Sequence, residues 1–242
     1  MINRINDLSP RATSRIAGIL YLLIIASGIF AEFFVRTGLI VSGEPAVSVN
    51  NIAVSIGLFK LGIAGDIVMI ICDIAIALIF YHLLKPVNKS LSLLAAFFRL
   101  VQAAILGANL LSLFKVVQIV GKADYLSGFS PDQINSMVMM NLDSHTTGYS
   151  LALVFFGFSI LILGYLIFKS GYIPKILGVL LIIASIGYLT DSFSSFLFAN
   201  YEVYKDIFQT VVFAPAFIGE LAFALWLLLK GVKLQQLSEV NK

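Results

Sequence analysis

Apolar residues in this chain gather into six long runs that are separated by short polar segments. A helix needs about 20 apolar residues to cross the ~30 Å hydrocarbon core of a bilayer, and each run reaches that length. The pattern therefore predicts six membrane-spanning helices. They cover residues 16–35, 58–84, 91–120, 145–168, 176–198 and 207–229.

Helices suit these runs better than the strands of a membrane barrel. Within lipid every backbone N–H and C=O group must bond inside the protein, which leaves only helices or closed barrels. Barrel strands alternate apolar and polar residues over about 10 residues, whereas residues 151–167 and 176–186 are apolar on all sides and too long. The predicted fold is all-α, a polytopic transmembrane bundle of six helices, with residues 1–242 as a single transmembrane domain.

Turn signals mark the connections between the runs. Pro86 ends the second run, because proline cannot extend a helix without losing a hydrogen bond. The short link that follows predicts an antiparallel pair of the second and third spans. Ser130, Pro131 and Asp132 combine an N-cap with a proline at the first helical position. They predict a short surface helix that ends near Met140, in the outer loop between the third and fourth spans.

Basic residues indicate which ends of the spans face the cytoplasm. Short loops on the cytoplasmic side carry an excess of Lys and Arg. With six spans and a cytoplasmic N-terminus, the inner side holds ten basic residues and the outer side three. The inner set is Arg4, Arg11, Arg15, Lys85, Lys89, Lys169, Lys175, Lys230, Lys233 and Lys242, and the outer set is Arg36, Lys122 and Lys205. Both termini are therefore expected on the cytoplasmic side of the cell membrane.

Composition indicates a chain whose surface meets lipid. Of the 242 residues, 60% are apolar and 12% are charged, whereas a soluble domain has about 25% charged residues. The net charge of +3 comes without a basic cluster that interleaves aromatic residues, so no nucleic-acid partner is expected. The single cysteine, Cys72, lies in an apolar run and cannot form a disulfide within the chain. The expected partners are membrane lipids and, for a polar interior, a small ligand.

The first run resembles a signal peptide only superficially. Arg4, Arg11 and Arg15 precede it, as basic residues precede the apolar segment of a signal peptide. The run is longer than the ~7–15 residues of such a segment, and the bulky Phe33 and Phe34 stand where a cleavage site needs small residues. The run is expected to remain as the first span.

The candidate functional residues are polar or charged side chains inside the predicted spans. A charge at the bilayer centre costs about 2.5–3.5 kcal/mol on insertion scales, so such residues usually face the bundle interior and pair with one another. The candidates are Glu32, Asp66, Asp73, Arg99, Gln102, His145, Asp191 and Glu220.

Depth along the spans sorts the charged candidates into two groups. Counting about 1.5 Å per residue from the span ends puts Asp73, Arg99 and Glu220 well inside. A guanidinium offers five donors and fits carboxylates bidentately, so one arginine between two carboxylates could keep three charges in lipid. The outer group, which could line a cavity open to the outside, is Glu32, Lys60, Asp66, Lys115, His145 and Asp191.

Two functions remain open for these side chains. They could be structural, as buried ion pairs that fix which helices are neighbours in a non-catalytic accessory membrane protein. They could instead line the polar intramembrane cavity of a small-solute or ion- or proton-linked transporter or binder, with Asp66, Asp73 and Glu220 as proton or cation acceptors. Tight pairing without a cavity favours the first function, and a water-sized cavity that reaches Asp66 and Asp73 favours the second.

Motifs for enzymatic chemistry are absent from the sequence. Gly-x-Ser-x-Gly and the two glycine-rich nucleotide-binding patterns do not occur. His82 and His145 are expected near opposite membrane faces and so cannot share a metal ion, while catalytic zinc usually needs three protein ligands. No catalytic residue, metal or cofactor is therefore predicted. The one enzymatic alternative is a lipid reaction at the outer face through His145 and Asp191.

Several stretches of the chain resemble one known family. They are residues 15–22, 31–36, 84–89, 95–103 and 187–193. The Phe-Arg-Leu-Val-Gln sequence at 98–102 is the most specific of them. Together they are similar to the bacterial domain-of-unknown-function family 4386, uncharacterised multi-pass integral membrane proteins, over nearly the whole chain. The resemblance implies a bacterial inner-membrane protein and brings no activity, substrate or site residue.

Overall fold

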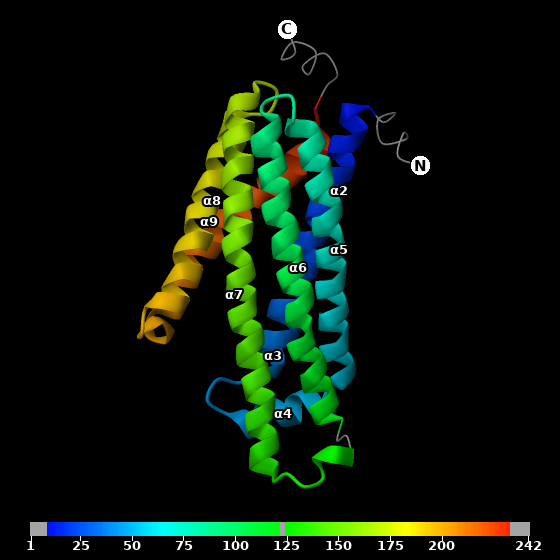
Figure 1. The fold of residues 1–242 in the computed structure, drawn as a ribbon, viewed down its shortest axis with the longest axis vertical. Coiled ribbons are helices and arrows are strands. Elements are labelled where there is room, and N and C mark those ends of the chain that lie inside the picture. The colour runs from blue at the N-terminus through cyan, green and yellow to red at the C-terminus, as the bar shows by residue number, and fades with distance from the viewer. Residues whose placement is uncertain (1–8, 122–123, 233–242) are drawn as a thin grey trace. The chain divides into compact units, whose positions relative to one another are not determined.

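The computed structural model describes residues 9–121 and 124–232, and every regular element within these ranges is a helix (Figure 1). The prediction of an all-α chain is therefore confirmed for this part of the protein. The elements are α2 (Pro10–Ile29), the π-helical segment η1 (Phe30–Arg36), α3 (Thr37–Leu39), α4 (Pro45–Val54), α5 (Ile56–Leu84), α6 (Lys89–Val120), the 3-10 turn η2 (Asp124–Leu126), α7 (Pro131–Ser170), α8 (Lys175–Leu197) and α9 (Tyr201–Leu229).

Five helical stretches are long and apolar enough to cross a membrane. They are Pro10–Leu39, which joins α2, η1 and α3, and the single helices α5, α6, α7 and α8. The sixth predicted span, residues 207–229, lies on α9, whose described apolar stretch is the shorter Ala214–Leu229. The structure therefore supports a multi-pass membrane protein with five candidate spans.

Part of the predicted orientation falls on residues without a described structure. Arg4, Lys122, Lys233 and Lys242 lie outside the described residues, and so does the side chain of Lys205 on α9. The cytoplasmic location of both termini accordingly stays a prediction.

Capping chemistry sets where α7 begins. The Ser130 N–H donates to Oε1 of Gln133 at 2.8 Å, and the Gln133 N–H donates to Oγ of Ser130 at 3.3 Å. Pro131 occupies the first helical position, where its missing N–H removes no helical hydrogen bond. The predicted helix start at these residues is confirmed.

The prediction that a separate surface helix ends near Met140 is wrong, because α7 continues without a break to Ser170. The segment just after Met140 holds neither proline nor glycine that would interrupt a helix. Two of its polar side chains, Asn141 and Ser144, donate to carbonyls one turn back at 2.8 and 2.7 Å. Because these groups are satisfied inside the helix, α7 replaces both the short helix and the span predicted at residues 145–168.

The connection after the first predicted span also holds helical structure. The first span continues through η1 and α3 to Leu39, and the short helix α4 then begins at Pro45. Oγ of Ser48 accepts a hydrogen bond from the Val41 N–H at 2.9 Å, which ties α4 to the turn before it. No element is predicted here from the sequence, because α4 is short and mixes polar with apolar residues.

The helices are divided between two compact units. Unit 1 contains Met1–Leu23, Cys72–Ala103 and Ser150–Lys242, and unit 2 contains Ile24–Ile71 and Ala104–Tyr149. Helices α2, α5, α6 and α7 each contribute residues to both units.

Glycines bring the helices of unit 1 into close contact. A Cβ atom at Gly164 on α7 would lie 2.7 Å from the carbonyl oxygen of Gly178 on α8, and a Cβ at Gly178 would lie 2.5 Å from the carbonyl oxygen of Gly164. A Cβ at Gly18 on α2 would lie 2.9 Å from the carbonyl oxygen of Ala224 on α9. Helix backbones thus meet at small residues, as is common where lipid removes the hydrophobic drive for helix association.

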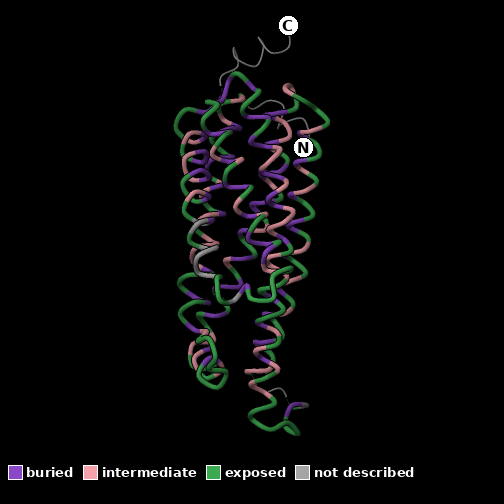
Figure 2. Tube along the Cα trace, turned by 90° about the vertical axis from the view of Figure 1, so that its left-hand side faces the viewer, coloured by how far each residue is buried: buried purple, intermediate pink, exposed green. Residues whose placement is uncertain are grey.

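Unit 2 has an apolar core to which three long helices contribute. Phe59 and Ile63 on α5, Leu113 and Val116 on α6, and Val138 on α7 are each at most 3% exposed. Buried and exposed positions alternate along the long helices of both units (Figure 2). The exposed positions include many large apolar side chains, which suits helix faces that turn to lipid.

Candidate functional site

Arg99 and Asp73 form the central ion pair of unit 1. Arg99 on α6 donates from Nε and Nη2 to Oδ1 of Asp73 on α5, at 2.9 and 2.6 Å. Gln102, one turn after Arg99 on the same face of α6, donates from Nε2 to Oδ2 of Asp73 at 2.9 Å. Arg99 and Asp73 are each 1% exposed, so this pair and its amide partner are shielded from solvent.

Glu220 on α9 is bound by tyrosines instead of by a cation. The Tyr21 hydroxyl on α2 donates to Oε2 of Glu220 at 3.0 Å, and the Tyr188 hydroxyl on α8 donates to Oε1 at 2.7 Å. Glu220 is 6% exposed. Among the side chains that the structure describes, no basic one lies within ion-pair distance of it. The predicted arrangement has Arg99 between two carboxylates, whereas its direct carboxylate partner in the structure is Asp73.

Tyr21 connects the two parts of the unit 1 network, which consists of Tyr21, Asp73, Arg99, Gln102, Tyr188 and Glu220. The Arg99 guanidinium carbon lies 5.4 Å from the centre of the Tyr21 ring and 5.0 Å from that of Phe156. Aromatic faces attract a guanidinium, most strongly where water is excluded. The same tyrosine therefore contacts the cation through its ring and the second carboxylate through its hydroxyl.

Two polar atoms of the unit 1 network have no hydrogen-bond partner within the described part of the chain. They are Nη1 of Arg99 and Oε1 of Gln102. Arg99 also lines a cavity of about 10 Å³ together with Ser92 and Ser159. That volume is about the size of one water molecule. The cavity adjoins the arginine, and neither Asp66 nor Asp73 lines it.

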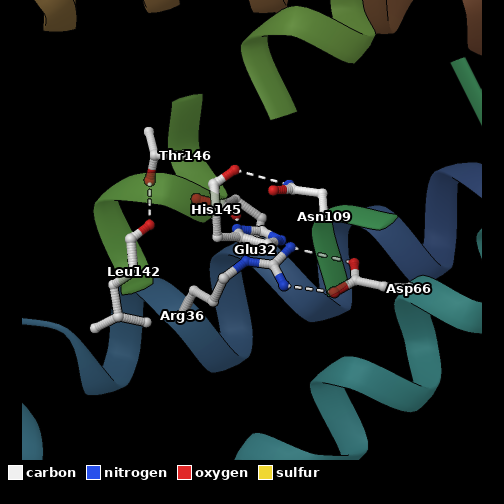
Figure 3. A network of polar contacts seen from close by, with 7 residues as sticks. All are labelled: Glu32, Arg36, Asp66, Asn109, Leu142, His145 and Thr146. Atoms are coloured by element: carbon white, nitrogen blue, oxygen red, sulfur yellow. Dashed lines mark hydrogen bonds and ion pairs between the residues drawn. The ribbon is translucent and has the colours of Figure 1, made fainter. Parts of the chain in front are cut away.

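A second network lies in unit 2 and is centred on Arg36 (Figure 3). Arg36 in η1 donates from Nη1 and Nη2 to the two oxygens of Asp66 on α5, at 2.7 and 3.3 Å. Its Nε donates to Oε2 of Glu32 at 2.7 Å. Arg36 and Asp66 are buried, whereas the Glu32 side chain is 53% exposed. We call Glu32, Arg36 and Asp66 the unit 2 network.

His145 and Asn109 lie next to the unit 2 network. His145 on α7 is 5% exposed, and its ring lies beside the Arg36 guanidinium (Figure 3). Its backbone carbonyl accepts a hydrogen bond from Nδ2 of Asn109 on α6 at 2.8 Å. Gly148 permits this contact, because a Cβ atom there would overlap the Asn109 amide.

Asp191 lies on α8 in unit 1 and is bound by a tyrosine. Its Oδ1 accepts a hydrogen bond from the Tyr201 hydroxyl at 2.7 Å, which joins α8 to the start of α9. The grouping of Asp191 with Asp66 and His145 stays a prediction. Within the described residues, no group of three or more His, Cys, Asp and Glu side chains is arranged to hold a metal ion.

The family model described as "Domain of unknown function (DUF4386)" matches residues 16–231 of this chain. The chain belongs to that family. An uncharacterised protein from Archaeoglobus fulgidus is 34% identical to this DUF4386 chain over 174 residues, which are 72% of this chain and 86% of the relative. No solved structure matches the chain.

The family resemblance predicted from the sequence is thereby confirmed. The DUF4386 match includes all eight candidate residues, from Glu32 to Glu220. The family description assigns no activity.

Several residues that complete these networks were not among the candidates. Arg36 was assigned to the outer loop, although its spacing of four from Glu32 is the spacing of a helical ion pair. Tyr21 and Tyr188 lie in apolar runs, where tyrosine resembles any other large apolar residue. A buried tyrosine hydroxyl needs a partner, and three of the candidate carboxylates, Asp73, Asp191 and Glu220, lie in unit 1.

Proposed function

We propose that this DUF4386 protein is a six-span protein of the cell membrane, with cytoplasmic termini, and that it is a proton-linked small-solute or ion transporter. The unit 1 network would hold the proton. The observation that carries the proposal is Glu220, a buried carboxylate that meets only neutral donors. Its binding partners would be membrane lipids and a small solute.

With both carboxylates ionised, the unit 1 network has a net charge of −1. Arg99 neutralises Asp73, with which it shares two hydrogen bonds. The carboxylate of Glu220, the second in the network, then has no paired cation. An uncompensated charge in a low-dielectric interior is costly, and binding a proton removes that cost.

Tyr21 and Tyr188 oppose the protonation of Glu220. A hydroxyl donor on each carboxylate oxygen stabilises the charged form of Glu220. Burial thus favours the protonated form and the tyrosines favour the ionised form. A group balanced between two such influences can exchange a proton, and ionisable residues inside membranes commonly mark proton pathways.

Tyr21 offers a way to couple the proton to the rest of unit 1. Its hydroxyl donates to Glu220, and its ring lies against Arg99. A protonated Glu220 becomes a possible donor to Tyr21, so the orientation of the hydroxyl and the negative potential at Arg99 would both change. A cation entering the cavity beside Arg99 could not replace the proton there, because the guanidinium would repel it.

The apolar part of α9 and the placement of the basic residues support six spans. Residues Tyr201–Leu229 form one helix, whose apolar part would be the sixth span. An even number of spans keeps the basic residues on one side, which the positive-inside rule favours.

Infrared difference spectroscopy of the purified full chain tests the proposal. As the pH is lowered, a protonated-carboxyl band from a buried group should appear in the natural protein and be missing in Glu220→Gln. Glu32→Gln is the matched control, because Glu32 also lies outside the arginine–aspartate pair of its network but contacts Arg36 and is half-exposed, and this variant should retain the band. A band that persists in Glu220→Gln would contradict the proposal.

A structural role is the second candidate function, and the unit 2 network favours it. Both carboxylates there contact Arg36 directly, and Asp66 fits the guanidinium bidentately. Such a network fixes the first span against α5 without any group that needs a further ligand. If the infrared titration finds no protonating group, this role would extend to unit 1 as well.

A further inference from the structure

An open groove of about 670 Å³ lies at one end of unit 1, where four helices begin or end. Its lining includes three basic side chains from different segments: Arg11 in the first turn of α2, Lys175 at the start of α8 and Lys230 just after α9. No acidic residue lines it. Within the described part of the chain, none of the three cations forms an ion pair.

The walls of the groove are held in place by the ends of the helices. Gly231, with a φ of +64°, ends α9, and a Cβ atom there would lie 3.3–3.4 Å from atoms of the first turn of α2. The Val232 N–H then donates to Oγ of Ser14 at 3.1 Å. These contacts keep Arg11 next to Lys230.

The loop from α7 to α8 forms the opposite wall. The Tyr172 hydroxyl donates to the Leu83 carbonyl in the last turn of α5, at 2.6 Å. Burial raises the pKa of the Tyr172 phenol above its usual value, so the hydroxyl stays protonated as a donor. The loop is thereby anchored, and Lys175 follows it directly.

Three positive charges around a space of this size favour an anion. The volume is within the range of small-molecule sites. We infer that the groove binds the phosphate of an anionic phospholipid headgroup. Because several cations contribute, the attraction should come from Arg11, Lys175 and Lys230 together.

The position of the groove favours a lipid over a free phosphate compound. It lies where the apolar helices α7 and α8 end, so it belongs at a membrane–water boundary. Trp226 lines it and is half-buried, and tryptophan is enriched at that boundary. Exposed apolar side chains next to it, such as Ile176 and Leu229, offer surface for acyl chains. Basic pockets between membrane helices are known to hold anionic headgroups.

Trp226 makes the inference directly testable, because it is the only tryptophan in the chain. The purified full chain in an uncharged detergent is titrated with dioctanoyl phosphatidylglycerol, and the fluorescence of Trp226 is recorded. Dioctanoyl phosphatidylcholine and inorganic phosphate are titrated in parallel. A saturable change is expected with phosphatidylglycerol alone, and it should weaken as salt is raised.

Variants of the groove lysines give a second readout. Each lysine removed should weaken binding by about fivefold, so Lys175→Gln with Lys230→Gln should weaken it roughly 25-fold. Lys89→Gln is the matched control, because Lys89 is also an exposed lysine at the first position of a long helix in unit 1, outside the groove. It should bind as the natural protein does.

Three results would overturn the inference. An equal response to phosphatidylcholine would mean that the charge is not recognised. Saturation by inorganic phosphate at similar concentrations would assign the groove to a soluble phosphate compound. Unchanged binding in the double lysine variant would exclude the groove as the site. These outcomes do not depend on protonation of Glu220.

Discussion

The two networks of this DUF4386 protein contain the same charged groups, one arginine with two carboxylates, yet they are built differently. In unit 2, both carboxylates contact Arg36, and the one outside the bidentate pair, Glu32, is half-exposed. In unit 1, the carboxylate outside the pair, Glu220, is buried and bound by tyrosines. The number of charged groups therefore does not distinguish the two networks. They differ in the environment of the carboxylate outside the arginine–aspartate pair.

Hydration of the carboxylate explains why the difference between Glu32 and Glu220 matters. A half-exposed carboxylate such as Glu32 keeps much of its hydration, so its charge costs little. Glu220 has lost that hydration and gained two hydrogen bonds without a compensating positive charge. The unit 2 network can thus be stable in one protonation state, whereas the unit 1 network has reason to use two.

Removing the arginines should produce the largest effects and sharpen the comparison. Arg99→Gln leaves two buried carboxylates without a cation, and we expect the free energy of unfolding to fall by about 3–5 kcal/mol. Arg36→Gln leaves only one buried carboxylate, Asp66, so a smaller loss is expected. Thermal or SDS-induced unfolding of the purified proteins measures both. Adding Asp73→Asn to Arg99→Gln should recover part of the loss, and the absence of any recovery would contradict the pairing.

Asp66→Asn should have an intermediate effect. Arg36 loses its bidentate partner but keeps Glu32, so the guanidinium is still neutralised. We expect the free energy of unfolding to fall by about 1–3 kcal/mol, since buried hydrogen bonds to a charged group are lost. The same unfolding assay measures it. A loss as large as that of Arg99→Gln would mean that the two networks depend equally on their buried pairs.

Tyr188→Phe tests the tyrosine support of Glu220. The variant removes the hydroxyl that donates to Oε1 of Glu220 at 2.7 Å. We expect a loss of about 1.5 kcal/mol in the free energy of unfolding, because a hydrogen bond to a carboxylate is lost. In a Glu220→Gln background the loss should be smaller, since the acceptor is then neutral. Equal losses in both backgrounds would indicate that the hydroxyl acts elsewhere.

The sequence was sufficient for the features that depend on local chemistry. Run length identified the long apolar helices, and Ser130 with Pro131 identified the start of α7, because spanning length and capping are properties of a few neighbouring residues. The continuity of α7 past Met140 was missed, since polar residues there satisfy themselves within the helix.

The candidate site was less predictable for a different reason. Depth in the membrane correctly suggested that Asp73 could reach Arg99. Depth does not say which helices are neighbours, so it does not predict the tyrosine partners of Asp191 and Glu220. The π-helical segment that carries Glu32 and Arg36 likewise has no local signal in the sequence.

The smallest effect on stability, and the sharpest test of the comparison, is expected from neutralising the carboxylate outside the arginine–aspartate pair in each network, Glu220 in unit 1 and Glu32 in unit 2. Glu220→Gln keeps the shape of the side chain and one hydroxyl acceptor while it removes the uncompensated charge. We therefore expect the free energy of unfolding to stay within about 1 kcal/mol or to rise, as is common where a functional site stores a destabilising group. Glu32→Gln should change it by no more than about 0.5 kcal/mol, because half-exposed pairs contribute little. A loss above about 2 kcal/mol in Glu220→Gln would mean that its charge stabilises the bundle, and unit 1 would then be structural in the same way as unit 2.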